Sequence, residues 1–80
     1  MSVRERLIRF IIAEFAEGKV ERLGDDENLI DQGLIDSVSI LELIAFIERE
    51  FSVTLPVDEV VPENFRSIRA LSTLIESKQR

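Results

Sequence analysis

Apolar residues follow a helical period on two sides of the segment SVSILELIAFIEREF, residues 37–51. With successive side chains about 100° apart, the larger apolar set forms one broad arc. We predict that this arc faces a core, and it contains Ile40, Leu41, Leu43, Ile44, Ile47 and Phe51. A second, smaller set contains Val38, Ala45 and Phe46. A helix that is apolar on two sides needs neighbours on both, which favours a helical bundle.

The second side of this helix has two interpretations. A preceding loop can cover part of it at Phe46 and leave the rest free for a partner protein. Alternatively, Val38 and Ala45 are ordinary small surface residues, because single exposed apolar side chains are common.

The first third of the chain predicts one further helix and a loop. Ser2 and Glu5 have the spacing of a capping box, and a helical pattern follows to about Ala16 or Glu17, with Gly18 as the C-cap. Residues 18–36 contain three glycines, a DDEN cluster and scattered apolar residues. Long loops in compact domains are usually functional or disordered, and the apolar residues here favour an ordered loop across the helices.

The last third predicts a short helix and a longer one. Pro56 and Pro62 bracket a short turn or helix around residues 58–61, and Ser67 can cap a final helix with inward-facing apolar residues. The predicted fold is therefore all-α: a small four-helix bundle with three main helices, a short third helix and a long loop between the first two. We expect residues 1–80 to form a single domain.

Composition excludes several kinds of site. The chain has no cysteine and no histidine, so it lacks thiolates, the usual general base and the usual zinc ligands, and we expect neither a catalytic centre nor a metal site. The longest apolar run is the five residues 43–47, far short of the roughly 20 that span a bilayer. We expect a monomeric cytoplasmic protein without membrane insertion.

Acidic residues concentrate in the middle of the chain. The net charge is −6, and residues 25–63 hold eleven acidic residues against Arg49, a balance of −10. This charge disfavours nucleic acid binding. The acidic middle is either a solvated face that promotes solubility or a docking site for basic partners.

Ser37 stands where the loop meets the central helix. Asp36 and Ser37 are both good N-cap residues, and Ser37 can be only a cap. It is not a self-activated nucleophile, because the chain has no GxSxG motif and no histidine, and Ile40 stands where a Ser-x-x-Lys motif needs lysine. The remaining role is a hydroxyl that another enzyme modifies, and a helix N-terminus suits a phosphate ester.

The sequence resembles the acyl carrier protein family. The resemblance rests on GLIDS, on Glu42 and Leu43 after four intervening residues, on ILELIAFIEREF as the second helix, and on PENFRSIRALSTLI as the third and fourth. It implies that Ser37, after Asp36, carries 4′-phosphopantetheine, which a magnesium-dependent phosphopantetheinyl transferase attaches from coenzyme A. The arm's thiol then holds acyl or aminoacyl groups as thioesters.

The resemblance also implies partners and a subtype. Expected partners are the transferase, an acyl- or aminoacyl-activating ligase and downstream acyl-transferring enzymes, docking on Val38, Glu42, Ala45 and Glu48. Gly33 stands four residues before Ser37, a spacing similar to D-alanyl carrier proteins, while Ser39 and Arg49 depart from fatty-acid carriers. The sequence leaves the cargo open. The rival hypothesis is an unmodified acidic helical adaptor that docks a basic protein.

Overall fold

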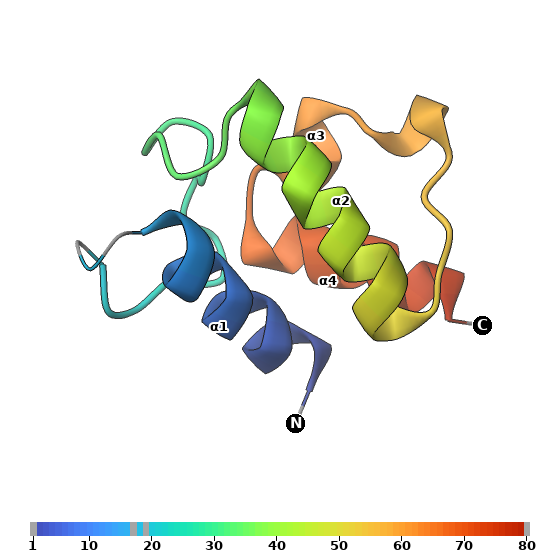
Figure 1. The fold of residues 1–80 in the computed structure, drawn as a ribbon, viewed down its shortest axis with the longest axis horizontal. Coiled ribbons are helices and arrows are strands. Elements are labelled where there is room, and N and C mark those ends of the chain that lie inside the picture. Colours follow the sequence, from blue (N-terminus) through green and yellow to red (C-terminus); the bar gives the residue numbers. More distant parts are fainter. Residues whose placement is uncertain (1, 17, 19, 80) are drawn as a thin grey trace.

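The structure is a computed structural model that describes residues 2–16, 18 and 20–79. Its helices are α1 (Val3–Phe15), α2 (Ser37–Phe51), the 3₁₀ helix η1 (Val57–Glu59), α3 (Pro62–Phe65) and α4 (Ile68–Lys78), as Figure 1 shows. The described residues contain no strand, and the all-α prediction is confirmed.

Local capping signals set where the main helices begin. Ser2 and Glu5 form the predicted capping box, in which the Ser2 hydroxyl accepts the Glu5 N–H at 3.1 Å and the Glu5 carboxylate accepts the Ser2 N–H. The Ser67 hydroxyl accepts the Ala70 N–H at 3.1 Å and caps α4 as predicted. The predicted starts of both helices follow from these side chains.

The end of α1 is earlier than expected. The helix ends at Phe15, and Ala16, in right-handed helical conformation, is its C-cap. Gly18 is not the C-cap but adopts a φ of +80°, which favours glycine, as the chain leaves the helix. The alternative end at Glu17 lies outside the described residues.

The segment between α2 and α4 is divided differently from the prediction. A single turn or helix was expected at residues 58–61, but η1 covers Val57–Glu59 and α3 then begins at Pro62. Proline suits the first helical position because its missing N–H would have no intrahelical partner there. Pro62 therefore starts a helix of its own, at the place where the family resemblance put the third helix.

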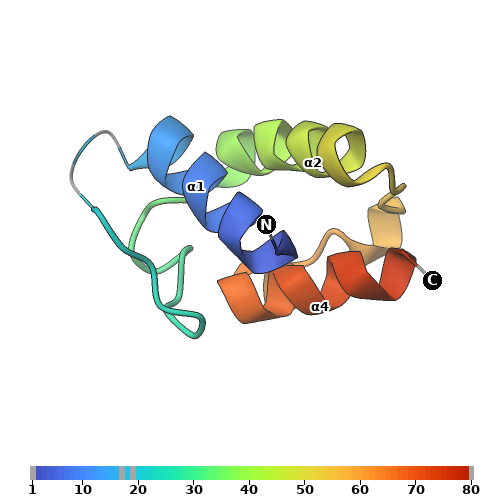
Figure 2. The ribbon, with the colours of Figure 1, turned by 90° about the horizontal axis from the view of Figure 1, so that it is seen from below.

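The three longer helices surround one core. In Figures 1 and 2, α2 and α4 lie on opposite sides of the molecule and α1 crosses beside both. The fully buried large side chains come from all four α-helices and from the loop before α2: Leu7, Ile11, Leu29, Ile35, Leu43, Ile47, Phe65, Ile68, Leu71 and Ile75. One continuous cluster thus joins the loop to the helices.

Two side chains of α2 lie where the sequence did not place them. Leu41, predicted in the core arc, is 68% exposed. One interpretation placed Phe46 under the loop, but its ring stacks on Phe10 of α1 with 3.8 Å between centroids. The second apolar side of α2 is therefore divided between a contact with α1 and open solvent.

None of the helices in residues 2–16, 18 and 20–79 combines the length and the apolar character that crossing a membrane requires.

Candidate functional site

Ser37 is the first residue of α2, and Asp36 is its N-cap. One carboxylate oxygen of Asp36 accepts the backbone N–H of Val38 at 3.0 Å and that of Ser39 at 2.8 Å. Ser37 is exposed, and its hydroxyl takes part in none of the hydrogen bonds among the described residues. The cap is therefore Asp36, which leaves the Ser37 hydroxyl available at the helix end.

The N-terminus of α2 stabilises negative charge. The pKa of the Asp36 carboxyl lies below its ordinary value, above all because the Ser39 N–H donates to it, with the Val38 N–H adding to the effect. Asp36 is therefore ionised at neutral pH. The positive end of the helix dipole also faces Ser37, so a phosphate ester on its hydroxyl would be stabilised.

The cap has a testable consequence for stability. Asp36→Ala removes the acceptor for two N–H groups, and we expect the melting temperature to fall by several degrees, whereas Asp36→Asn keeps a capping oxygen and loses less. Because the pKa of Asp36 is lowered in the folded state, its stabilisation is present above the unfolded pKa and is lost as the pH falls through the folded value. Thermal melting at pH 7 and pH 3 measures both effects. An alanine variant with the wild-type pH profile would contradict this role.

The loop before Ser37 is ordered by contacts around Leu29. Its N–H donates to the carbonyl of Arg66 at 2.7 Å, and its carbonyl accepts the N–H groups of Leu34 at 3.0 Å and Ile35 at 3.3 Å. The Leu29 side chain is fully buried. These contacts fix the approach of the chain to Ser37 against the junction of α3 and α4.

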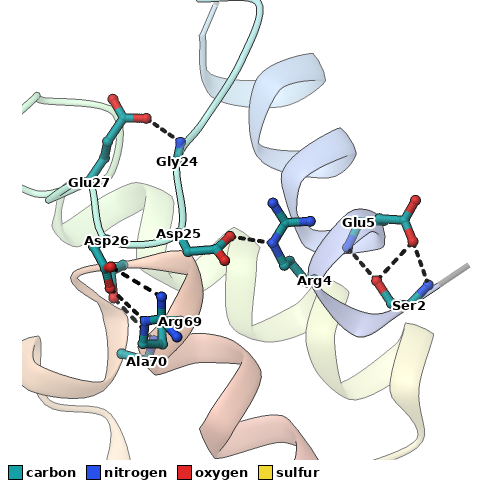
Figure 3. Close-up of polar contacts among 10 residues, drawn as sticks. Ser2, Arg4, Glu5, Gly24, Asp25, Asp26, Glu27, Arg69 and Ala70 are labelled. Atoms are coloured by element: carbon teal, nitrogen blue, oxygen red, sulfur yellow. Dashed lines mark hydrogen bonds and ion pairs between the residues drawn. The ribbon is translucent and has the colours of Figure 1, made fainter.

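Two ion pairs hold the middle of the same loop to α1 and α4 (Figure 3). Asp25 pairs with Arg4 of α1, and Asp26 pairs with Arg69 of α4 at 2.6 Å. The Arg69 contact lowers the pKa of the Asp26 carboxyl, chiefly through a side-chain hydrogen bond, and the backbone N–H of Arg69 donates to the Asp25 carbonyl at 2.9 Å. The loop therefore lies across the helices, as the scattered apolar residues predicted.

Ion pairs also divide the acidic residues into two groups. Asp25, Asp26, Glu50 and Glu59 pair with bases from the two ends of the chain: Arg4, Arg69, Arg6 and Lys78. Asp36 and Glu42 belong to none of the ion pairs within the described residues, and both are exposed. The negative charge that remains unpaired thus includes the first turns of α2, beside Ser37.

The outward face of α2 begins at Ser37. Val38, Leu41 and Ala45 are exposed and follow the i, i+3, i+7 spacing of one helix face, with Glu42 exposed beside them. We call these four residues the α2 face. Sequence analysis missed Leu41, although its spacing from Val38 and Ala45 is the signal that assigns it here.

Glu48 lies three positions after Ala45 and seven after Leu41, on the same side of α2 but beyond the four residues of the α2 face. It is half-buried, and its carboxylate accepts the backbone N–H of Leu55 at 2.9 Å. This bond ties the segment after α2 back to the helix. The structure therefore gives Glu48 a local role that the sequence did not indicate.

No group of three or more acidic side chains within the described residues is arranged to hold a metal ion.

Residues 6–75 match the family model described as "Phosphopantetheine attachment site". The chain belongs to the phosphopantetheine-dependent carrier protein family. Members of this family carry 4′-phosphopantetheine and are in general not catalytic themselves.

A relative with a known role is similar over nearly the whole carrier. The D-alanyl carrier protein of Streptococcus suis is 34% identical over 77 residues, which cover 95% of each chain. Together with the family match, this similarity shows that the present chain is a carrier protein that presents a tethered substrate.

Two solved structures contain chains with the fold of this carrier. The first is the crystal structure of an FAD-dependent dehydrogenase, with a TM-score of 0.80 and 33% identity over 88% of this chain and 99% of that one. The second is the glycine:[carrier protein] ligase of Bradyrhizobium japonicum, complexed with its cognate carrier protein and an analogue of glycyl adenylate. Its matching chain has a TM-score of 0.74 and 27% identity, over 95% of this chain and 99% of that one.

Proposed function

We propose that Ser37 is the attachment point of the 4′-phosphopantetheine arm. The observation that carries this proposal is that Asp36, and not Ser37, caps α2. Asp36 caps the helix through Val38 and Ser39, while the exposed Ser37 hydroxyl makes no hydrogen bond within the described residues. A hydroxyl that the fold does not use is one that an enzyme can modify without unfolding the helix.

Attachment is a phosphoryl transfer from coenzyme A. The Ser37 oxygen forms a phosphodiester with the phosphate that bears the pantetheine, the hydroxyl proton is released, and the adenosine bisphosphate half of coenzyme A leaves. A separate, magnesium-dependent transferase supplies the base, because this chain has no histidine. The arm's thiol then holds the cargo as a thioester.

Partner enzymes dock on the α2 face. Its apolar residues supply contact area beside Ser37, and Asp36 and Glu42 supply negative charge that attracts basic surfaces. Glu48 adds charge further along the helix. We propose three kinds of partner: the phosphopantetheinyl transferase, a ligase that activates an acyl or aminoacyl group, and downstream acyl-transferring enzymes. The carrier in complex with a glycine ligase supports the second kind.

The chain acts as a carrier and not as a catalyst. It contributes an attachment residue and a docking face, and the chemistry belongs to the enzymes that visit it. Because coenzyme A donates the arm, we place the protein in the cytoplasm, where coenzyme A is available.

Intact-mass spectrometry distinguishes the carrier from an unmodified acidic adaptor. The purified chain is incubated with coenzyme A, magnesium and a broad-specificity phosphopantetheinyl transferase. We expect complete conversion to a species heavier by one arm, and no conversion when magnesium is omitted. A chain whose mass stays unchanged would support the adaptor, while two added arms would show that Ser37 is not the sole acceptor.

A further inference from the structure

A small pocket lies between the loop before α2 and α3. It has a volume of about 230 Å³ and is lined by Asn28, Ile30, Asp31, Pro62, Glu63 and Arg66. The lining combines two carboxylates, a guanidinium and a side-chain amide with the apolar groups of Ile30 and Pro62. Such a mixture suits a small polar ligand better than a long hydrocarbon chain.

Backbone contacts bring this pocket close to Ser37. The Leu29 carbonyl accepts the N–H of Ile35 at 3.3 Å, and Ile35 is two positions before Ser37. Ile30, which lines the pocket, directly follows Leu29. The Leu29 N–H donates to the Arg66 carbonyl at 2.7 Å, which holds the other wall at the same point. From Asp31 to Ser37 the chain spans at most about 20 Å even when fully extended, and the turn at residues 30–33 shortens it further. The Asp31 wall of the pocket therefore lies within about 20 Å of Ser37, a distance that an extended arm on Ser37 must span to reach it.

The polar groups of the pocket have capacity to bind a ligand. Asp31 and Glu63 belong to none of the ion pairs in the described part of the chain, unlike the four acidic residues that pair with bases. The side-chain oxygen of Asn28 accepts the N–H groups of Ile30 and Asp31. The side-chain N–H₂ group of Asn28 can therefore donate to a ligand. Arg66 is exposed and is also outside those ion pairs.

We propose that this pocket receives an aminoacyl group at the end of the arm, with its ammonium group between Asp31 and Glu63. The carbonyl oxygens of the thioester and the arm then face the donors of Arg66 and Asn28. This inference rests on the proposed attachment at Ser37 and adds the class of cargo. Contacts that are weak for a free ligand suffice here, because a short flexible tether gives an effective concentration in the millimolar range.

A neutral acyl group fits the same pocket less well. It would displace water from two carboxylates and offer them no hydrogen bond or opposite charge, which is unfavourable. Leu43 and Ile47 on the interior side of α2 are fully buried, so a long chain would have to displace packed side chains to enter there. The charge of the cargo, and not its size, therefore decides occupancy.

The experiment compares two cargoes of nearly equal shape. Coenzyme A analogues with a glycyl or a propionyl group in a stable amide linkage are transferred to the ¹⁵N-labelled chain, and mass spectrometry confirms one arm on each sample. The two cargoes differ chiefly in an ammonium group in place of a methyl group. We expect the glycyl arm to shift the backbone amide signals of Asp31 and Glu63 and the propionyl arm to leave them near their positions in the arm without cargo.

Single variants test the carboxylates separately. Asp31→Asn and Glu63→Gln are each expected to reduce the glycyl-specific shifts at the other residue by more than half, while both chains still gain one arm. Loaded chains whose glycyl and propionyl spectra agree in this region would overturn the pocket assignment and leave the attachment proposal standing. Failure of both arms to attach would instead overturn the attachment proposal, and the pocket assignment with it.

Discussion

Ser37→Ala is expected to abolish attachment of the arm completely, while Ser39→Ala is modified as fully as the wild type. The alanine at position 37 lacks the only oxygen that the proposed phosphodiester can use. Ser39 is the matched control because it lies in the same first turn of α2, and its backbone N–H is already bonded to Asp36. Intact-mass spectrometry after incubation with the transferase and coenzyme A measures both variants. Modification of Ser37→Ala, or its loss in Ser39→Ala, would move the attachment point.

The same variant must keep its fold for this result to be meaningful. Asp36 and not Ser37 caps α2, so removing the Ser37 hydroxyl breaks no hydrogen bond among the described residues. We expect the free energy of unfolding to stay within about 0.5 kcal/mol of the wild type, as for most surface substitutions. Circular dichroism and thermal melting provide this control.

Local signals predicted most of the secondary structure. The capping box at Ser2 and Glu5 and the cap at Ser67 were assigned correctly because each depends on residues three positions apart. The choice between Asp36 and Ser37 as the cap of α2 was not possible from sequence, since both residue types are good caps and each could accept N–H groups of the first helical turn. Only the backbone geometry shows that Asp36 occupies the N-cap position.

The helix α2 was predicted correctly, but which of its side chains are exposed was harder to predict. The apolar arc drawn from periodicity was too broad, because an angular position does not tell how far neighbouring helices extend around a helix. Leu41 lies at the edge of that arc and is exposed, whereas Leu43 is fully buried. The partner of Phe46 could not be inferred either, because Phe10 is 36 positions away in the sequence.

The long-range ion pairs could not be predicted from the sequence either. The acidic middle of the chain gave the correct sign of the charge but not its distribution, because pairs such as Arg4–Asp25 and Arg69–Asp26 form only after α1 and α4 meet the loop. These pairs neutralise part of the negative surface. The acidic residues Asp36 and Glu42 remain outside them, close to Ser37.

Two leucines of α2 give the sharpest test of the docking face. Leu41 is 68% exposed and Leu43 is fully buried, so one substitution, leucine to arginine, places the same charge in solvent or in the core. Leu41→Arg is expected to keep the circular dichroism spectrum and a free energy of unfolding within about 1 kcal/mol of the wild type. Transfer of the arm to Ser37 should nevertheless slow by about tenfold or more, as for the loss of an interface hot spot. Val38→Arg is expected to behave in the same way.

Leu43→Arg is expected to do the opposite. Its guanidinium would be stranded among apolar side chains without a partner, at a cost of at least about 3 kcal/mol, which is a large part of the stability of a domain this small. Thermal melting should therefore separate the two variants before any transfer assay is run. A folded Leu41→Arg chain that accepts the arm at the wild-type rate would remove Leu41 from the docking face, because the added charge and bulk stand one helical turn from Ser37. A Leu41→Arg chain that unfolds like Leu43→Arg would instead show that Leu41 is buried in solution, and the core arc predicted from periodicity would then be correct as drawn.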